Sequence, residues 1–160
     1  MDKWLCFVCG SNKRIGLNLN FELDRENHQA SCSTVISDEY QGWDGIIHGG
    51  IIASILDGSM VYACKSMDLA CITAELTVRY KKPVPVNTQV KIIAKVKDQI
   101  QWMSYTLICT EAIMKMDGGI AAKAKAKMFV THNIKLNEAP CTVESASERD
   151  TLLQGDSIGI

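Results

Sequence analysis

The most apolar stretch of the chain, residues 46–67, is the feature that most constrains the fold. A membrane span is the first interpretation to test for such a stretch. However, it contains His48, Asp57 and Lys65, and an aspartate at the centre of a membrane helix costs about 3 kcal/mol on insertion. Three glycines and several serines weaken that interpretation further. We therefore predict that residues 49–67 form a buried helix in a soluble protein.

The segments on either side of this helix alternate apolar and polar residues, which is typical of strands with one solvated face. Two strands are predicted before the helix, at residues 16–24 and 29–37. Four are predicted after it, at residues 71–80, 88–97, 101–116 and 120–130. Asp68 is expected to close the helix, and Pro83 and Pro85 interrupt the first of the later strands, because a central strand does not tolerate proline.

The last predicted strand suggests how the helix and the strands pack. Within residues 120–130, Ala122, Ala124 and Ala126 alternate with lysines, so a small-residue face lets the helix approach closely while the lysines face solvent. A helix of about 18 residues is about 27 Å long, which strands of 9–11 residues match at about 3.3 Å per residue. The predicted class is α+β, with one long central helix wrapped by a curved antiparallel sheet of five to six strands.

Length and composition restrict the function classes. The 160 residues fit one domain, which we place at residues 1–136 with an N-terminal segment at 1–15, followed by a loose polar tail at 137–160. An apolar fraction of 47% and a charged fraction of 22% exclude wholesale disorder. The formal net charge of −1 argues against a nucleic-acid partner, because neutralising phosphates needs an excess of lysine and arginine. No membrane partner is expected either.

The seven cysteines are interpreted as reduced thiols. The first ten residues lack the apolar run of a signal peptide, so we expect a cytoplasmic protein, where thiols stay reduced. Four cysteines in apolar runs are expected to fill the core: Cys32, Cys64, Cys71 and Cys109. Cys6 and Cys9 have the CxxC spacing of half a zinc site or of a redox pair. No second CxxC or histidine pair follows, so we predict no metal and no cofactor.

Candidate chemistry gathers on the predicted helix. Its start reads His48-Gly49-Gly50. Helix N-termini carry unpaired N–H groups and about half a positive charge, and glycine lets a ligand approach the backbone, so this end can hold a phosphate or an oxyanion. Asp57 lies near mid-helix, where a carboxylate needs a partner or a function. Thr73 opens the next strand, where its hydroxyl can position a water.

A structural interpretation of the same residues stays open. A helix that starts after a glycine turn also reads HisGlyGly, and a lone histidine is more often a satisfied core residue. The spacing of Gly49 and Asp57 favours a site shared between two subunits. Gly49 and Asp57 are eight residues apart, about 12 Å along a helix, whereas groups acting on one carbonyl must each lie about 3 Å from it. If both residues act, they come from two subunits, which predicts a homodimer with two sites at its interface.

Residues 42–57 (GWDGIIHGGIIASILD) resemble the helix signature of hotdog-fold acyl-CoA thioesterases. The most similar branch is the PaaI-type branch of the phenylacetate pathway, which has an aspartate nine residues after the histidine, as Asp57 is here. Residues 74–83 (AELTVRYKKP) resemble the following strand with its Tyr-x-x-Pro end. Residues 6–10 and 16–17 resemble an N-terminal segment of some members, so the likeness covers residues 6–131.

The resemblance implies an enzyme that hydrolyses acyl-CoA to a carboxylic acid and free CoA. Gly49 would donate its backbone N–H to the thioester oxygen, and Asp57 would be the base that activates water, or the nucleophile. Thr73 would hold the water, and His48 would shape the carbonyl site. Substrate-binding candidates are Gly50 at the helix start and, for the CoA phosphates, the cations near the strand end: Arg79, Lys81 and Lys82.

Two alternatives remain beside hydrolysis. Related enzymes carry an asparagine six residues before the histidine, whereas this chain has Gly42; a non-catalytic acyl-CoA binding module is therefore the second hypothesis. The third is a hotdog dehydratase acting on hydroxyacyl thioesters, which would need a histidine and an acidic residue near the reacting carbons. For each of these, a homodimer or a homotetramer is the expected assembly.

Overall fold

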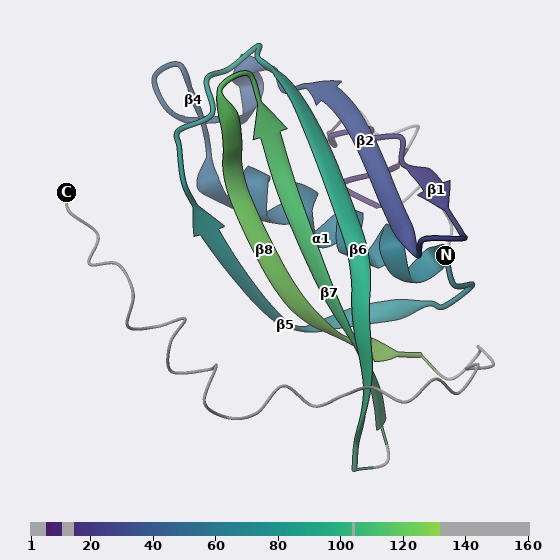
Figure 1. The fold of residues 1–160 in the computed structure, drawn as a ribbon. Helices are drawn as coiled ribbons and strands as arrows, with labels where there is room; N and C mark the ends of the chain where they lie inside the picture. The colour runs from purple at the N-terminus through teal and green to yellow at the C-terminus, as the bar shows by residue number, and fades with distance from the viewer. Residues whose placement is uncertain (1–5, 11–14, 104, 132–160) are drawn as a thin grey trace.

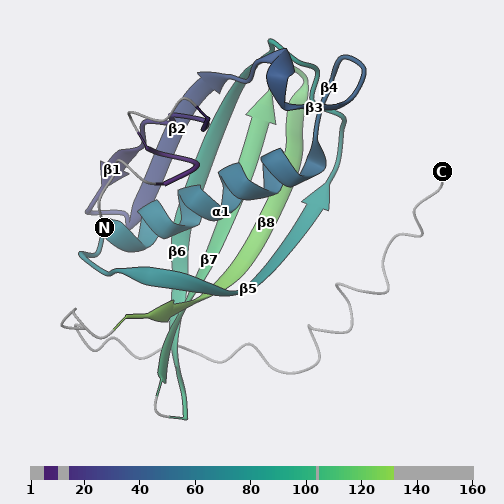
Figure 2. The ribbon, with the colours of Figure 1, turned by 180° about the vertical axis from the view of Figure 1, so that it is seen from behind.

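The computed structural model describes residues 6–10, 15–103 and 105–131 of the 160-residue chain. One helix, α1 (Gly49–Lys65), lies across one face of a curved antiparallel sheet of six strands (Figures 1 and 2). The order across the sheet is β1, β2, β6, β7, β8, β5. The predicted α+β architecture, a single long helix wrapped by such a sheet, is therefore confirmed.

The other elements complete the topology as follows. The six strands of the sheet are β1 (Glu22–Asp24), β2 (Gln29–Val35), β5 (Cys71–Tyr80), β6 (Gln89–Trp102), β7 (Tyr105–Met116) and β8 (Gly119–Val130). A short 3-10 helix, η1 (Asp38–Tyr40), and a small hairpin of β3 (Gln41–Trp43) and β4 (Ile46–Ile47) connect β2 to α1. This hairpin delivers the chain to the first residue of the helix.

The helix packs on the sheet through side chains that are fully or almost fully buried, among them Ile55, Leu56 and Met60. It ends two residues earlier than predicted, at Lys65. Asp68 nevertheless terminates it as expected, because this residue adopts the left-handed conformation (φ 60°) that does not continue a helix. Among the residues that the structure describes, no helix has the length and apolar character that crossing a membrane requires.

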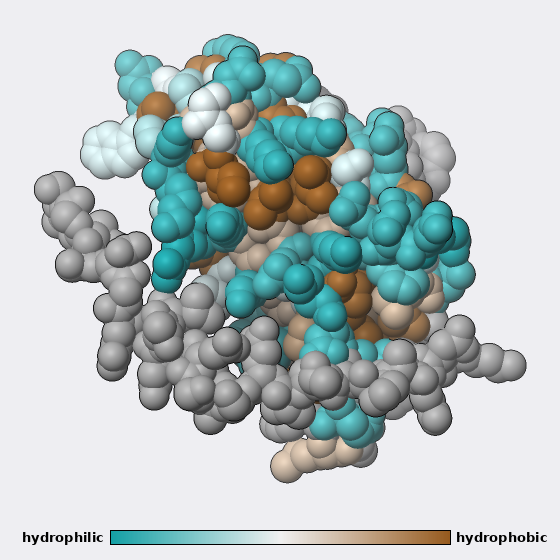
Figure 3. All heavy atoms as spheres, in the orientation of Figure 1, coloured by the Kyte–Doolittle hydropathy of each residue, from teal (hydrophilic) through white to brown (hydrophobic). Residues whose placement is uncertain are grey.

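The alternation in β8 positions the helix as predicted. Ala122, Ala124 and Ala126 are at most 5% exposed and lie on the face of the sheet that α1 covers. The intervening Lys123 and Lys125 are exposed on the outer face. Figure 3 shows this outer face as hydrophilic side chains around a hydrophobic strip. Small side chains under the helix thus allow the close packing that the sequence suggested.

The prediction of one strand over residues 16–24 is wrong for most of its length. Only Glu22–Asp24 join the sheet, as β1. The preceding backbone pairs elsewhere, since the N–H groups of Leu17 and Leu19 donate to Phe7 O and Val8 O, each at 2.8 Å. The apolar alternation is real, because Leu19 is buried. The alternating residues belong to an N-terminal segment that packs on α1. Such a segment and a sheet strand have the same alternation, so the sequence pattern alone does not distinguish them.

The predicted break between residues 97 and 101 is also wrong. β6 continues without interruption to Trp102, and β7 begins at Tyr105. A β-bulge between Val96 and Asp98 absorbs the residue that interrupts the alternation. As a result the β6–β7 hairpin is longer than the helix and extends beyond the body of the sheet (Figure 1).

A second bulge changes which residues of β5 face the helix. The prediction placed Ile72, Ala74 and Leu76 on one face. The register shifts between Thr73 and Glu75, however, so that Thr73 opposes Met128 and Leu76 opposes Ala126. One extra residue reverses the alternation. Thr73 therefore joins the face that carries Leu76, whereas Ile72 is 55% exposed.

The cysteine prediction is confirmed for three residues and wrong for the fourth. Cys32, Cys64 and Cys71 are buried in the core. Cys109 is half-buried, because it alternates with the inward-facing Ile108 and Thr110 and so lies on the outer face of β7. Cys141 and the predicted tail at residues 137–160 lie outside the described residues.

Enlarging one alanine under the helix tests this packing. Ala124→Leu places a branched side chain where α1 contacts the sheet, and such overpacking costs about 1–3 kcal/mol of unfolding free energy. The matched variant Lys123→Leu, one residue away on the outer face, should change it by less than about 0.5 kcal/mol. Urea denaturation followed by circular dichroism measures both. Equal destabilisation of the two variants would contradict the assignment of these faces.

Candidate active site

His48 caps the start of the helix with its side chain. The imidazole Nδ1 accepts a hydrogen bond from Gly50 N–H at 2.9 Å, which places the proton of the neutral ring on Nε2. The ring lies between two glycines: a Cβ on Gly50 would approach Nδ1 to 3.0 Å, and a Cβ on Gly42 would approach Cδ2 to 3.0 Å. A side chain at position 42 would therefore crowd this imidazole.

Gly49 presents a backbone donor at the first helical position. The first N–H groups of a helix have no partner within it. Among the described residues, no acceptor is paired with the Gly49 N–H, whereas the neighbouring Gly50 N–H is satisfied by His48. On the other side of the same residue, the Tyr80 hydroxyl donates to Gly49 O at 2.8 Å. This contact holds the helix start against the end of β5.

An open hollow of about 300 Å³ adjoins this donor. We call it the N-terminal hollow; its lining comprises Ile46, Ile47, Gly49, Ile52, Tyr80, Lys81, Lys82, Pro83 and Val84. The two lysines are exposed, and Lys82 Nζ donates to Gly118 O. The helix N-terminus and two cations thus line one space, a combination that suits an anionic ligand.

Arg79, the third predicted phosphate ligand, lies elsewhere. Tyr80 points to the helix side of β5, so the preceding residue points to the outer face. There Arg79 is paired in register with Lys123 of β8. The structure therefore brings Lys81 and Lys82 together with Gly49 and separates Arg79 from them.

Asp57 forms the second part of the site. Its carboxylate is half-buried, and Oδ1 accepts a hydrogen bond from Thr73 Oγ1 at 2.6 Å. The β5 bulge makes this contact possible, because it turns Thr73 toward α1. The structure thus brings together two residues that were each predicted as site candidates.

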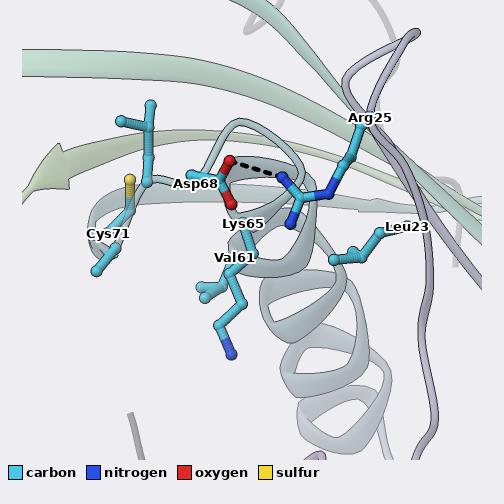
Figure 4. Close-up of a pocket in the computed structure, with 8 residues that line it drawn as sticks. Leu23, Arg25, Val61, Lys65, Asp68 and Cys71 are labelled. Carbon is cyan, nitrogen blue, oxygen red and sulfur yellow. Dashed lines mark hydrogen bonds and ion pairs between the residues drawn. The ribbon is translucent and has the colours of Figure 1, made fainter. Parts of the chain in front are cut away.

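A second hollow, of about 360 Å³, lies at the other end of the helix (Figure 4). We call it the C-terminal hollow; its lining comprises Leu23, Arg25, Val61, Lys65, Asp68, Leu69, Ala70 and Cys71. Asp57, Val61 and Lys65 are spaced four residues apart and so lie along one side of the helix. The walls are mainly apolar, and an exposed ion pair between Arg25 and Asp68 (2.6 Å) lies at the rim.

Tyr80 is a site residue that the sequence interpretation did not single out. Its alternation in β5 predicted only a core-facing side chain, yet it is 49% exposed and hydrogen-bonded to the residue that presents the free donor. The available signal was its position at the Tyr-x-x-Pro end of the strand. A long polar side chain at a strand end next to a helix start is able to bond that helix.

Comparisons with known proteins agree with this architecture. A family model described as the thioesterase superfamily matches residues 44–99, which include the helix start, Asp57 and Thr73. A thioesterase superfamily protein of known crystal structure is 22% identical with a TM-score of 0.68. That match covers 79% of this chain but 60% of the other, so the present chain spans less than two thirds of that protein.

Two further structures extend the comparison. PaaI of the phenylacetic acid degradation operon of E. coli is 18% identical with a TM-score of 0.63, over 71% of this chain and 83% of that one. A thioesterase protein of Streptococcus pneumoniae, crystallised with coenzyme A, is 19% identical with a TM-score of 0.61, over 72% and 87%. The hotdog fold of PaaI-type thioesterases, which the sequence resemblance predicted, is thus the fold of this chain.

The capping role of His48 is open to a direct test. His48→Ala removes the acceptor for Gly50 N–H and should lower the free energy of unfolding by about 1 kcal/mol. His48→Asn, whose side-chain oxygen is a good helix cap, should recover most of that loss. Urea denaturation of the three proteins measures the difference. If asparagine and alanine were equally destabilising, the hydrogen bond would not be what stabilises the helix start.

Proposed function

We propose that this hotdog-fold chain, whose central segment matches the thioesterase superfamily, is an acyl-CoA thioesterase that hydrolyses its substrate to a carboxylic acid and CoA. The hydrogen bond from Thr73 to Asp57 carries the proposal, because it leaves one carboxylate oxygen for chemistry. Oδ1 accepts from Thr73, and among the described residues no donor is paired with Oδ2. A carboxylate held in this way on a rigid helix is suited to act as a general base.

The proposed reaction uses one water. The water hydrogen-bonds to Asp57 Oδ2 and is positioned by Thr73 Oγ1. As its oxygen attacks the thioester carbon, its proton passes to Asp57, and the oxygen of the carbonyl becomes an oxyanion that a backbone N–H of Gly49 stabilises. Collapse of this intermediate breaks the carbon–sulfur bond. The CoA sulfur takes up a proton, and the acid product leaves. The same residues leave room for a second route, in which the Asp57 carboxylate itself is the nucleophile.

Gly49 and Asp57 of one chain cannot complete this site together. Both belong to α1, eight residues apart and so about 12 Å along its axis. Two helices placed antiparallel across a twofold axis would bring Gly49 of one chain beside Asp57 of the other. The edge strand β5 supports such a dimer, because it exposes Ile72, Leu76 and Tyr80 on an unpaired edge. A homotetramer of two such dimers is the larger assembly consistent with this proposal.

The N-terminal hollow is the proposed position of the CoA phosphates. Lys81 and Lys82 line it beside Gly49, and flexible ammonium groups bind phosphate as point charges. Gly50 lacks the Cβ that would meet the His48 imidazole at 3.0 Å, and Arg79, on the outer face of β5, is left out of the proposed phosphate site. The Streptococcus pneumoniae structure with coenzyme A supports a CoA ligand for this fold. No cofactor is proposed, and a cytoplasmic location remains a prediction.

The same relative supports the pairing of Asp57 with Thr73. Crystal structures exist of its alanine variants at an aspartate and at a threonine sixteen residues further along its chain. Asp57 and Thr73 have the same separation, 73 − 57 = 16. The apolar walls of the C-terminal hollow, which begins one helical turn after Asp57 at Val61, are the proposed surface for the acyl group.

A binding module without turnover is the second candidate, and Gly42 favours it. Position 42 has no side chain to place a polar group near the carbonyl, and the adjacent imidazole leaves little space for one. Such a protein would bind acyl-CoA through the same hollows. Activity measurements separate the two functions.

Hydrolysis by Asp57 variants tests the proposed base. An acyl-CoA panel of increasing chain length is assayed by release of free thiol. We expect turnover by the wild type and a loss of about 10²–10⁴-fold in kcat for Asp57→Ala and Asp57→Asn. Asp38→Asn is the matched control, because it removes an exposed carboxylate of η1 that lines neither hollow. Its kcat should stay near the wild-type value.

Each result of this panel has a separate meaning. Equal rates for the wild type and Asp57→Ala would exclude Asp57 as base or nucleophile. Tight binding of acyl-CoA by calorimetry without turnover across the panel would replace the thioesterase by the binding module. An enoyl product from a 3-hydroxyacyl-CoA would indicate a dehydratase.

Mixing two inactive variants tests the shared site. Gly49→Pro removes the proposed donor at a helix position that proline favours, and Asp57→Ala removes the base. In a mixed dimer, one of the two sites regains both groups. Random exchange in a 1:1 mixture makes half of the dimers mixed, so about a quarter of wild-type activity should return. Gly49→Ala is the control: it keeps the N–H, and its Cβ would meet Tyr80 at an ordinary 3.5 Å.

Subunit exchange is verified with differently tagged chains that copurify. If mixed dimers form and activity does not return, the site is not divided between subunits. A monomeric wild type with full activity would contradict the shared site as well.

A further inference from the structure

The N-terminal CxxC segment packs against the helix and is a defined part of the fold. Gly10 N–H donates to Cys6 O at 2.8 Å, which closes a turn over residues 6–10. Val8 of this turn is 8% exposed and fits against Gly58, where a Cβ would come within 2.7 Å of its Cγ1. The glycine in the helix thus provides the space for the segment. The proposed hydrolysis uses none of these residues.

The two thiols in this turn are in contact with each other. Cys9 N–H donates to Cys6 Sγ at 3.4 Å, and the Cys9 thiol also hydrogen-bonds to the Cys6 sulfur. The Tyr62 hydroxyl donates in turn to the Cys9 sulfur. Lys65, whose Nζ lies 4.2 Å from the centroid of the Tyr62 ring, brings a positive charge to the cluster. Tyr62, Cys9, Cys6 and Lys65 are therefore close enough to influence the two thiols, and the backbone N–H of Cys9 is hydrogen-bonded to the Cys6 sulfur.

The environments of the two thiols are unequal. Cys9 is 5% exposed, whereas Cys6 is half-buried and reaches solvent. Burial opposes ionisation of Cys6, but the hydrogen bonds from Cys9 and Val8 and the charge of Lys65 lower its pKa below the ordinary value of a thiol. Burial raises the pKa of the Cys9 thiol, and the adjacent Cys6 adds to this rise against the Tyr62 hydrogen bond. A solvent-accessible cysteine next to a buried one is typical of a nucleophilic and a resolving cysteine.

We propose that Cys6 and Cys9 form a reversible dithiol–disulfide site that reacts with small-molecule disulfides such as oxidised glutathione. Residues three apart in a turn have Cα atoms within about 7 Å, and a disulfide spans about 4.4–6.8 Å. The turn thus places the two sulfurs for ring closure without unfolding the segment. The site lies in residues 6–10 and does not depend on thioesterase activity.

The reaction is a balanced two-step exchange. The Cys6 thiolate attacks one sulfur of the oxidant, forms a mixed disulfide and releases one small thiol. Cys9 then loses its proton and attacks the Cys6 sulfur, which forms the Cys6–Cys9 disulfide and releases the second small thiol. The protein loses two electrons and two protons, and the oxidant is reduced to two thiols. An excess of small thiol reverses both steps.

A zinc site is the other chemistry that a CxxC turn suggests, and the surroundings favour the thiol pair instead. Structural zinc takes four ligands. Within residues 6–10, 15–103 and 105–131, no three side chains of histidine, cysteine, aspartate or glutamate gather in a way that could hold a metal. Cys9 is directed to Tyr62 and is almost inaccessible to a ligand from a second chain.

The fold contains a matched internal control. Cys64 of α1 and Cys71 of β5 are also close neighbours, because each thiol shifts the pKa of the other. Cys64 is 0% exposed, and Cys71, which lines the C-terminal hollow, is 6% exposed, so an external disulfide has much less access to this pair than to the half-buried Cys6. If contact between thiols were sufficient, both pairs would oxidise in the native protein. If oxidation instead requires that the oxidant reach one sulfur, only the Cys6–Cys9 pair will oxidise.

Mass spectrometry distinguishes these outcomes. The full-length protein, with Cys141→Ser in every sample to remove the thiol outside the described residues, is incubated with oxidised glutathione. Free thiols are then alkylated during unfolding, and peptides are mapped. We expect a Cys6–Cys9 disulfide that dithiothreitol reduces, with Cys64 and Cys71 alkylated. Cys9→Ser should accumulate the mixed disulfide on Cys6, and Cys6→Ser should show neither product at this segment.

Other results would overturn the proposal. These are a wild-type segment that stays fully reduced, oxidation of Cys64 and Cys71 at the same rate, or an unchanged yield of oxidised segment in Cys6→Ser. Stoichiometric zinc that copurifies with the wild type and is lost in Cys6→Ser would assign the segment to a metal. Circular dichroism melting of both serine variants confirms that the comparison is made on folded protein.

Discussion

The rise of an α-helix, about 1.5 Å per residue, is the constraint on which the proposed chemistry depends. It holds Gly49 and Asp57 about 12 Å apart on one rigid element, so neither end of α1 carries a complete site. The end at Gly49 has two lysines, a hollow and an N–H donor that no acceptor of the described residues satisfies. The position of Asp57 has a carboxylate with one hydroxyl partner. In the proposed reaction, a second copy of the same helix in the opposite direction would supply what each half lacks, which would make association part of catalysis.

A β-bulge in β5 positions side chains beside the helix that regular alternation would direct away from it. Without the bulge after Thr73, strict alternation would place either Thr73 or Leu76 on the helix side of β5, but not both. The extra residue lets the strand contribute a hydroxyl to Asp57 at one end and the Tyr80 contact to Gly49 O at the other. One edge strand thus contacts α1 at both positions, and among the described strands it has a neighbour on one side only.

The sequence predicted the elements that are long and regular. The glycine-rich start predicted the beginning of the helix at Gly49, and period-2 alternation predicted the alanine stripe of β8. The nine-residue spacing between His48 and Asp57 carried the resemblance that predicted the fold. Predictions from periodicity were wrong where strand pairing depends on residues elsewhere in the chain. The segment before β1 is hydrogen-bonded to Phe7 and Val8. A bulge at Asp98 lets β6 continue where the alternation is interrupted. The contact of Tyr80 with Gly49 depends on tertiary placement at the end of a strand, which alternation does not encode.

Successive helix residues are rotated by about 100°, and this rotation separates two kinds of chemistry on α1. Asp57 faces Thr73 of β5, whereas Gly58, the next residue, faces Val8 of the CxxC turn. The thiol cluster continues one turn further along, at Tyr62 and Lys65. Val8 of the turn that carries Cys6 and Cys9 therefore packs on the helix one residue from Asp57. Because Gly58 has no side chain, Val8 lies close to the helix backbone at this point.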